Sequence, residues 1–313
     1  MEFNASSANL LKIKVDSLIL PTGSQLKNNA KVIDETLDGT ISSLIKAGDF
    51  TGKSSEICVL HTLGQSHKRI ILLGTDGAST PQKMIKVIEA GARAAQKTTS
   101  AKVLWVGESL GDDHEWQASI VARSTLTAGY KYAGTGKKPK PNKLKSATYW
   151  TDSKKLSNAA SAGLQYGSAI GGGMNAARQL GNLPANICTP NYLAAQAKLL
   201  AKGQAKLTTS IVKEAEMKTL KMGSLLSVSA GSVEPGNLIV MKYQGAKSTV
   251  KPTVLVGKAV TFDTGGISLK PGRGMDEMKF DMCGGASVFG VMNALLETQL
   301  PVNVIGVIPA VEN

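Results

Sequence analysis

Histidine is scarce in this chain of 313 residues. The three histidines are His61, His67 and His114, and all of them lie in the first half. The second half therefore has no histidine for a Ser/His or Cys/His catalytic pair, or for an HExxH zinc site. An isolated histidine near a strand end is more often structural than catalytic, so we expect no histidine-based chemistry.

Cysteine is equally scarce. Cys58, Cys188 and Cys283 are widely separated, odd in number and form no CxxC pair. A disulfide framework or a cysteine-based zinc site is therefore not expected, and we interpret all three residues as reduced thiols.

Long apolar runs are missing as well. No stretch of about 18 uncharged apolar residues occurs, so we predict no membrane span. The first residues lack the basic start and apolar core of a secretory signal. These observations predict a cytoplasmic protein.

Nucleotide-binding loops are incomplete. Residues 48–54 are one residue short of a P-loop, and Gly257-Lys258-Ala259 lacks both the hydroxyl residue and the upstream glycine. We therefore do not expect a P-loop nucleotide site.

Positive charge is in excess. The formal net charge is +13, and the excess is spread over both halves of the chain. Only residues 137–145 form a dense lysine run, and its prolines favour a solvated loop. A DNA-binding or regulatory role for this basic surface remains an alternative hypothesis.

Apolar periodicity divides the chain into two α/β parts. Strand patterns at 11–20, 56–60, 69–73 and 103–107 alternate with helical patterns at 81–96 and 114–131. We predict an amino-terminal α/β domain over 1–155. An Ala/Gly/Ser-rich segment, 156–184, is interpreted as a connecting helix and linker that three glycines at 171–173 interrupt. Residues 185–313 form the first, incomplete part of a second βαβ-like α/β domain.

One stretch concentrates the chemically useful residues. Residues 254–256 predict a buried strand, and the chain then reaches Gly265-Gly266, where the backbone can approach a ligand closely. Lys258 and Asp263 follow the strand, and Lys270 and Asp281 lie beyond the glycines. In open α/β sheets, ligands bind outside the carboxyl ends of the strands.

This carboxylate and lysine cluster allows two interpretations. Asp263 and Asp281 offer the hard oxygen ligands that suit Mg²⁺, Mn²⁺ or Zn²⁺. Lys258, if neutral beside a cation, can donate a lone pair, and Lys270 can stabilise an oxyanion as an ammonium ion. On spacing alone, surface salt bridges around a glycine-rich turn explain the pattern equally well.

Residues 256–285 closely resemble the leucyl (cytosol) aminopeptidase family of dinuclear metallo-exopeptidases. Asn182-Leu183-Pro184-Ala185-Asn186 upstream and residues 300–306 downstream extend the resemblance, which covers roughly 160–313 strongly and the first half by element order only. It implies an amino-terminal macro-like α/β domain followed by an α/β metallopeptidase domain.

The resemblance also implies residue roles. Lys258, Asp263 and Asp281 match ligands of two divalent ions, Mn²⁺ or Zn²⁺, and Asp263 matches the bridging ligand. Lys270 matches the catalytic lysine, and Met278 matches a residue of the pocket for the amino-terminal side chain. These five residues together would contact the peptide substrate. Asp276 and Glu277 match no ligand.

The resemblance further implies a segment, Asn-Thr-Asp-Ala-Glu-Gly-Arg, that follows the matched region and supplies two more carboxylate ligands and a catalytic arginine. It is absent from this sequence. We therefore expect a carboxyl-terminally truncated aminopeptidase with leucine preference, weak metal binding and little turnover on its own. The complete enzyme is expected to be a homo-hexamer. A nucleotide-type ligand on the first domain is a further hypothesis.

Overall fold

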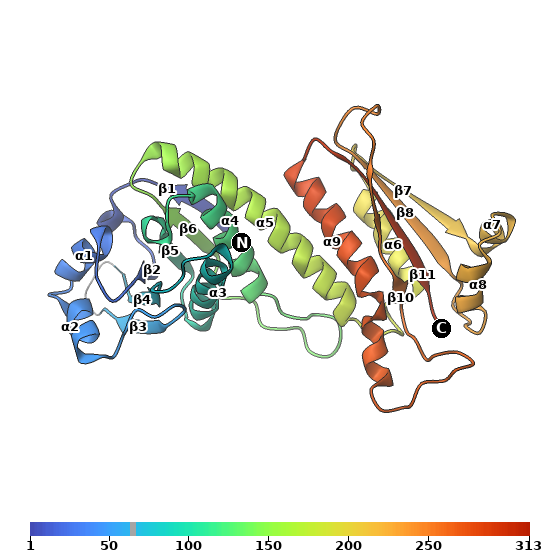
Figure 1. The fold of residues 1–313 in the computed structure, drawn as a ribbon, viewed down its shortest axis with the longest axis horizontal. Helices are drawn as coiled ribbons and strands as arrows, with labels where there is room; N and C mark the ends of the chain where they lie inside the picture. The colour runs from blue at the N-terminus through green and yellow to red at the C-terminus, as the bar shows by residue number, and fades with distance from the viewer. Residues whose placement is uncertain (63–66) are drawn as a thin grey trace. The chain divides into compact units, whose positions relative to one another are not determined.

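The computed structural model describes residues 1–62 and 67–313 and divides into two compact units (Figure 1). The first unit comprises Met1–Tyr130 and Lys140–Gly171, and the second comprises Lys131–Pro139 and Gly172–Asn313. Each unit is built on its own sheet, which confirms the predicted α/β class.

The first unit contains a six-stranded sheet with the order β1-β6-β5-β2-β4-β3. Neighbouring strands are parallel except for β3, which pairs antiparallel with β4 at one edge. The strands are β1 (Glu2–Ser6), β2 (Ser17–Thr22), β3 (Ile57–His61), β4 (Arg69–Gly74), β5 (Lys102–Val106) and β6 (Ser146–Trp150). Of the residues 11–20 expected to form strand, only the last four do so, because a short 3-10 helix, η1 (Leu10–Lys12), comes first.

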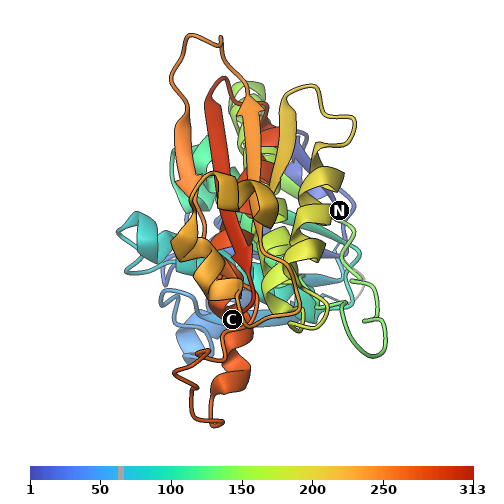
Figure 2. The same ribbon diagram turned by 90° about the vertical axis from the view of Figure 1, so that its right-hand side faces the viewer.

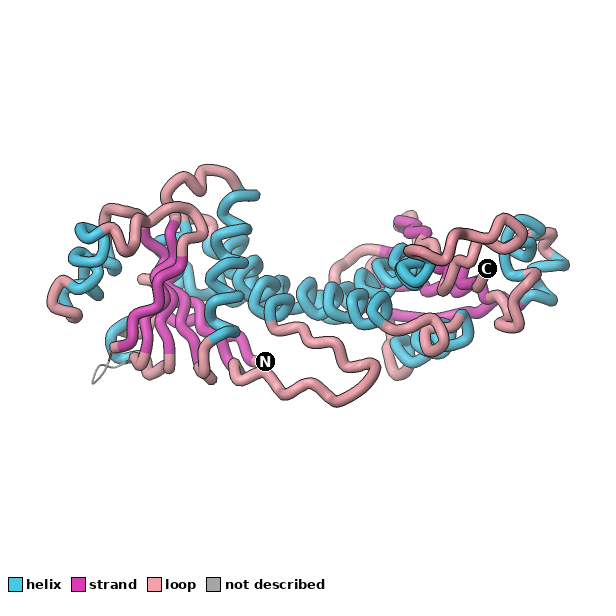
Figure 3. The backbone as a smooth tube through the Cα atoms, turned by 90° about the horizontal axis from the view of Figure 1, so that it is seen from below, coloured by secondary structure: helices cyan, strands magenta, loops and turns pink. Residues whose placement is uncertain are grey.

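Helices cover both faces of this sheet (Figure 3). They are α1 (Asn28–Glu35), α2 (Thr40–Ala47), α3 (Pro81–Lys97) and α4 (His114–Ala128), and a 3-10 helix, η2 (Gly107–Leu110), follows β5. Side chains on a strand alternate between faces. Ile19 and Ile71 accordingly pack in one cluster with α3 and α4, whereas Leu18 and Ile70 pack in another with α1 and α2. The unit is therefore a three-layer α/β/α structure.

Local capping explains where two of the helices begin. Thr80 accepts a hydrogen bond from the backbone N–H of Lys83, and Pro81 occupies the first turn of α3. Thr189 and Pro190 repeat this arrangement at the start of α6 (Pro190–Ala201). A threonine cap followed by proline satisfies an orphan N–H and presets the helical φ angle.

The long helix α5 (Lys154–Asn182) runs without a break through Gly171, Gly172 and Gly173. The expected interruption is therefore wrong. The reason is packing in the second unit: a Cβ at Gly173 would lie 2.4 Å from the carbonyl oxygen of Gly290, so glycine permits a close helix–helix approach. Within residues 1–62 and 67–313, no helix is both long and apolar enough to cross a membrane.

The second unit is built on a mixed sheet with the order β10-β11-β8-β7, and β9 also pairs with β11. The strands are β7 (Leu207–Lys213), β8 (Asn237–Gln244), β9 (Thr253–Val256), β10 (Ala259–Val260) and β11 (Asn303–Val311). The expected βαβ order holds for β9, α9 (Cys283–Thr298) and β11, because β9 and β11 are parallel. It fails for β8, which is antiparallel to both β11 and β7.

One face of this sheet packs against α6 and α9, where Ile239, Met241 and Ile308 are fully buried. Figure 2 looks onto the opposite face, on which the short helices α7 (Glu214–Thr219) and α8 (Gly223–Ser229) lie near the ends of β7 and β11. Val254 and Val256 of β9 project on this open face and are 54% and 72% exposed. The prediction of a buried strand at 254–256 is thus wrong.

Candidate active site

The candidate site lies where the chain leaves β9 and β10. Both strands run parallel to β11 and pair with consecutive parts of it, β9 with 304–307 and β10 with 310–311, so both lead toward the carboxyl end of β11. Lys258 follows β9, and Asp263 follows β10 by three residues. The chain then forms an irregular loop and a 3-10 helix, η3 (Met275–Met282), which carries Asp281 to the start of α9 (Figure 1).

Two glycines set the path of this loop. A Cβ at Gly257 would lie 2.5 Å from the carbonyl oxygen of Gly284, so only glycine allows the turn after β9 to contact the start of α9. The backbone N–H of Gly285 donates to the carbonyl of Lys258 at 2.7 Å. Gly265 has a φ angle of +92°, a conformation that other residues rarely adopt. The apolar strand and glycine pattern therefore position Lys258 beside the helix that follows Asp281.

Lys258 and Asp281 form an ion pair with 2.8 Å between Nζ and Oδ1. The other oxygen, Oδ2, is buried and has no hydrogen-bond partner among the described residues. A buried carboxylate oxygen without a partner is costly, so a hydrogen-bond donor or a cation at this atom would be stabilising. It is the single feature of the site that points most directly to a cation.

Asp263 is held by its own loop. Its Oδ1 accepts a hydrogen bond from the backbone N–H of Gly265 at 2.9 Å, and its Oδ2 pairs with the ammonium group of Lys270. The pairing with Lys270 is the main reason why the pKa of Asp263 lies below its usual value, and Lys258 contributes electrostatically. Both carboxylates are therefore neutralised by lysine.

The structure thus brings together four of the five predicted site residues. Met278 lies on η3, partly buried, and Asp276 and Glu277 beside it are exposed. Within the described ranges, no group of three His, Cys, Asp or Glu side chains could hold a metal ion. Two carboxylates and Lys258 are the possible metal ligands that the structure brings to this end of the sheet.

One contributor was missed from the sequence. Asn313 follows β11 at the same edge, and its backbone carbonyl accepts hydrogen bonds from the N–H and hydroxyl of Thr264, each at 3.0 Å. Its own side-chain oxygen is buried and has no partner among the described residues. The available signal was the polar pair Glu312 and Asn313 after the apolar strand β11, since ligands bind outside the carboxyl ends of strands in such sheets.

Comparisons with known proteins agree with this architecture. Residues 18–139 match the model described as "Cytosol aminopeptidase family, N-terminal domain", and residues 175–313 match "Cytosol aminopeptidase family, catalytic domain". A probable cytosol aminopeptidase from Nitrosococcus oceani is 41% identical over the whole chain, and the cytosol aminopeptidase of Pseudomonas aeruginosa is 39% identical. The chain spans 64% and 65% of the lengths of these two relatives.

Solved structures agree as well. A mutant of tomato leucine aminopeptidase superposes with a TM-score of 0.83 at 25% identity, over 100% of this chain and 63% of the plant protein. The bottromycin maturation enzyme BotP, in a complex with Mn, gives a TM-score of 0.74 at 24% identity, over 95% of this chain and 60% of BotP.

The fold is that of a two-domain α/β protein whose second domain matches an aminopeptidase-family catalytic domain. The chain belongs to the cytosol aminopeptidase family, as the family models and the relatives together show. The resemblance deduced from residues 256–285 is confirmed, and so is the short length relative to family members. The DNA-binding alternative finds no support in these comparisons.

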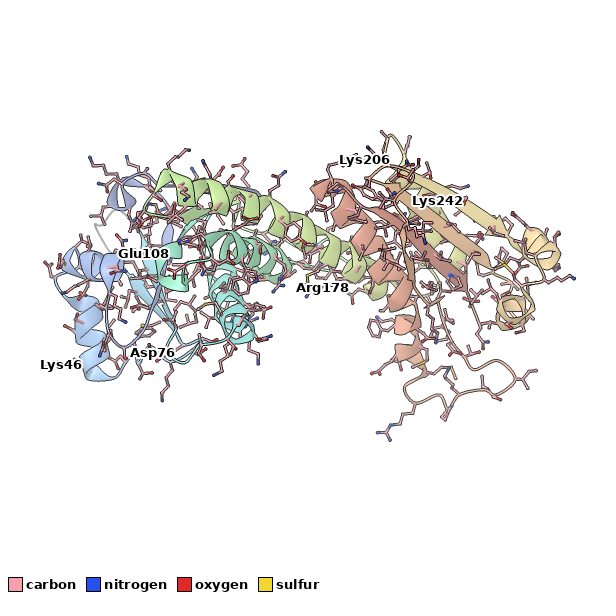
Figure 4. The ribbon with its side chains drawn as sticks, turned by 45° about the horizontal axis from the view of Figure 1, so that its top comes forward. Lys46, Asp76, Glu108, Arg178, Lys206 and Lys242 are labelled. Atoms are coloured by element: carbon pink, nitrogen blue, oxygen red, sulfur yellow. The ribbon has the colours of Figure 1, made fainter. Side chains whose placement is uncertain are left out.

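A polar cavity lies in the first unit, at the carboxyl ends of β2, β4 and β5. It has a volume of about 360 Å³, and Asp76 and Glu108 (Figure 4) are among its lining residues. A hydrogen bond from the backbone N–H of Ser24 to Asp76 holds the pKa of that carboxyl below its usual value. A phosphate group would face two carboxylates and only Lys27, so the charge of this cavity opposes a nucleotide-type ligand.

Proposed function

We propose that this chain forms part of a metal-dependent aminopeptidase that removes amino-terminal residues, preferably leucine, from peptides. Family membership supports the reaction class. The observation that carries the proposal is the cluster where the chain leaves β9 and β10. There two carboxylates and two lysines converge, and the buried Oδ2 of Asp281 lacks a partner among the described residues.

We assign Lys258, Asp263 and Asp281 as ligands of two divalent cations, Mn²⁺ or Zn²⁺, with Asp263 shared between them. The donor set fits, because carboxylate oxygens and a neutral amine suit such ions. Lys258 must lose a proton to become a ligand, and a nearby cation favours that loss. When bound, the cations would polarise the scissile carbonyl and lower the pKa of a water molecule.

The ion pairs explain how the site is kept together. Lys258 and Lys270 supply two positive charges to the two carboxylates. For Asp263 to bind a cation through Oδ2, the ammonium group of Lys270 must leave that oxygen. We propose that Lys270 then contacts the oxygen of the scissile carbonyl and stabilises the negative charge that develops there.

Substrate recognition is assigned to the same residues. The ligands Lys258, Asp263 and Asp281 and the charged Lys270 would surround the peptide's amino terminus and first carbonyl. We propose that Met278, a partly buried and flexible apolar side chain, lines the pocket for the amino-terminal side chain. An apolar pocket suits a leucine side chain.

We propose that the chain alone binds metal weakly and turns over little substrate. Its cluster contains two carboxylates, and the described residues add no third His, Cys, Asp or Glu ligand. The complete protein would add ligands from the segment that the family resemblance implies. For that protein we propose a homo-hexamer, which the family resemblance implies. We also propose that it is located in the cytoplasm, in line with the names of the relatives.

Hydrolysis of leucine p-nitroanilide tests this function. The 313-residue chain is assayed with Mn²⁺ or Zn²⁺, with and without a chelator, and again after a family-type carboxyl-terminal segment has been fused to it. We expect chelator-sensitive turnover from the fusion and little from the chain alone. Absence of turnover from a folded, metal-loaded fusion would contradict the aminopeptidase assignment. Strong turnover by the chain alone would contradict the incomplete ligand set.

A further inference from the structure

A groove lies between the edge strand β3 and helix α3 in the first unit. Its volume is about 560 Å³, within the range of small-molecule sites. Alternate residues of β3 form one wall, and residues about one helical turn apart on α3 form the other. The lining residues are Ile57, Val59, His61, Arg69, Ala90, Arg93, Ala94, Lys97, Thr98 and Thr99.

The charge of this groove has one sign. Three cationic side chains, Arg69, Arg93 and Lys97, line it, and no aspartate or glutamate does. Arg93 is the only one of these three in an ion pair among the described residues, with 3.8 Å between its Nη1 and Oε2 of Glu89. Cationic groups gathered without carboxylates attract an anion.

Arg69 is the best ordered of these cations. Its Nη2 donates to the hydroxyl of Thr99 at 2.7 Å, and its Nη1 lies 3.5 Å from the hydroxyl of Ser100. Ser100 is itself buried and hydrogen-bonded to Ser17. The guanidinium is thus half-buried and held by neutral hydroxyls, and no carboxylate neutralises it within the described part of the chain. A fixed fork of N–H donors is suited to bidentate binding of a carboxylate.

The two walls of the groove also carry apolar side chains. Ile57 and Val59 of β3 face Ala90 and Ala94 of α3, and Val59 is 40% exposed. An exposed β-branched side chain beside a row of cations favours a ligand that has both an apolar part and a negative group. A simple inorganic anion would leave this apolar surface in water.

We propose that the groove binds a carboxylate attached to an apolar chain of several carbon atoms. Arg69 takes the carboxylate, Lys97 and Arg93 add charge, and Val59 and Ala94 contact the apolar chain. The carboxylate can come from a free monocarboxylic acid or from the carboxyl terminus of an apolar peptide. This ligand site is independent of the proposed peptidase function and lies wholly within the first unit.

Calorimetric titration of the 313-residue chain with octanoate tests the proposal, with octanamide as the neutral analogue. We expect saturable binding of octanoate and none of octanamide. N-acetyl-leucyl-leucine and its carboxyl-terminal amide are titrated in parallel to identify the source of the carboxylate. Binding of either acid, but of neither amide, supports the proposal. Equal binding of octanoate and octanamide would overturn it.

Substitutions locate the site. Arg69→Gln should weaken octanoate binding about tenfold, because it removes a charge-assisted bidentate contact. Val59→Asp should abolish binding by placing a carboxylate in the groove. Lys86→Gln, on the exposed side of α3, is the matched control and should bind like the unmodified chain. Thermal unfolding of each variant checks the fold.

Three results would contradict the assignment. The first is unchanged octanoate affinity in folded Arg69→Gln and Val59→Asp. The second is an equal loss of affinity in Lys86→Gln. The third is that the chain self-associates and binds no octanoate, while Val59→Asp makes it monomeric. The groove would then be a contact between two copies of the chain.

Discussion

Lys258 and Asp281 form a 2.8 Å ion pair although 23 residues separate them in the chain. Lys258 is 61% exposed at its side chain and Asp281 is 22% exposed, so the pair lies at the rim of the site rather than in the core. An exposed pair of this kind contributes little to stability, on the order of 0–1 kcal/mol. Its proposed value is functional, since it keeps a carboxylate and an amine together where the chain leaves β9 and enters α9.

Asp263→Asn is the sharpest test of the site. In the completed enzyme, the substitution should lower kcat/KM by about a thousandfold or more, because it removes the shared carboxylate ligand. Bound metal, measured by atomic absorption after dialysis, should fall as well. Asp276→Asn, on the exposed η3 helix, is the matched control and should leave both quantities unchanged.

The fold should survive Asp263→Asn, because the oxygen of the new amide group can still accept a hydrogen bond from the backbone N–H of Gly265. Circular dichroism and the unfolding midpoint of the variant check this expectation. Near-normal turnover by metal-loaded Asp263→Asn would refute the ligand assignment.

Asp16 gives the first unit a pH-dependent stability. Its carboxylate accepts hydrogen bonds from Lys68 and from the backbone N–H groups of Ala101 and Lys102, and the contact with Lys68 is the main cause of its lowered pKa. Because the folded pKa lies below the unfolded value of about 3.9, this stabilisation is complete above that value. It is lost as the pH falls through the folded pKa.

We expect Asp16→Asn to cost roughly 1–2 kcal/mol at pH 7 and less at pH 3, since the bonds to a charged acceptor are lost. Urea unfolding at several pH values between about 3 and 7 measures the effect. Equal differences in unfolding free energy at every pH would show that the charge of Asp16 is irrelevant.

Gly257→Ala tests the contact between the turn after β9 and the start of α9. The new Cβ would lie 2.5 Å from the carbonyl oxygen of Gly284 and 2.8 Å from Val288, so the backbone must move. A destabilisation of about 1–3 kcal/mol is expected from such overpacking. Gly272→Ala, which meets no atom within 4 Å, is the control in the same region. Similar urea midpoints for the two variants would argue against the close contact.

Alanine substitutions at Gly172 and Gly173 of α5 should change the stability of the second unit in opposite directions. At Gly172 a Cβ meets only the side chain of Asn293, at 3.9 Å, so Gly172→Ala should stabilise the second unit by about 0.5–1 kcal/mol through helix propensity. At Gly173 a Cβ would lie 2.4 Å from the carbonyl oxygen of Gly290, so Gly173→Ala should destabilise the second unit. Differential scanning calorimetry of both variants compares them, and a gain at both positions would mean that α5 and α9 are not closely packed.

Local signals in the sequence predicted much of the fold. Helices α3 and α4 and strands β4 and β5 follow apolar periodicity and capping, which depend on near neighbours. β1 was missed because Glu2–Ser6 contains little apolar alternation, and it forms by pairing with β6, more than a hundred residues away. The continuity of α5 depends on a partner glycine in α9, which periodicity alone does not reveal.

The candidate site was predicted for a different reason. Lys258, Asp263, Lys270 and Asp281 belong to one long and specific motif, so the resemblance identified them before any geometry was known. Their pairing, and the buried oxygen of Asp281, depend on how the loop after β10 folds back. The exposure of Val256 likewise depends on what covers the sheet, which a short apolar run does not specify.

The open face of the second sheet also governs how the protein behaves in concentrated solution. Val254 and Val256 are exposed beside the free edge of β9, and such an edge invites pairing between molecules. The net charge of +13 keeps molecules apart at low ionic strength, and added salt screens that repulsion. The solubility of this chain should therefore fall as the salt concentration is raised. Adding salt, which is often done to keep a basic protein in solution, should have the opposite effect here.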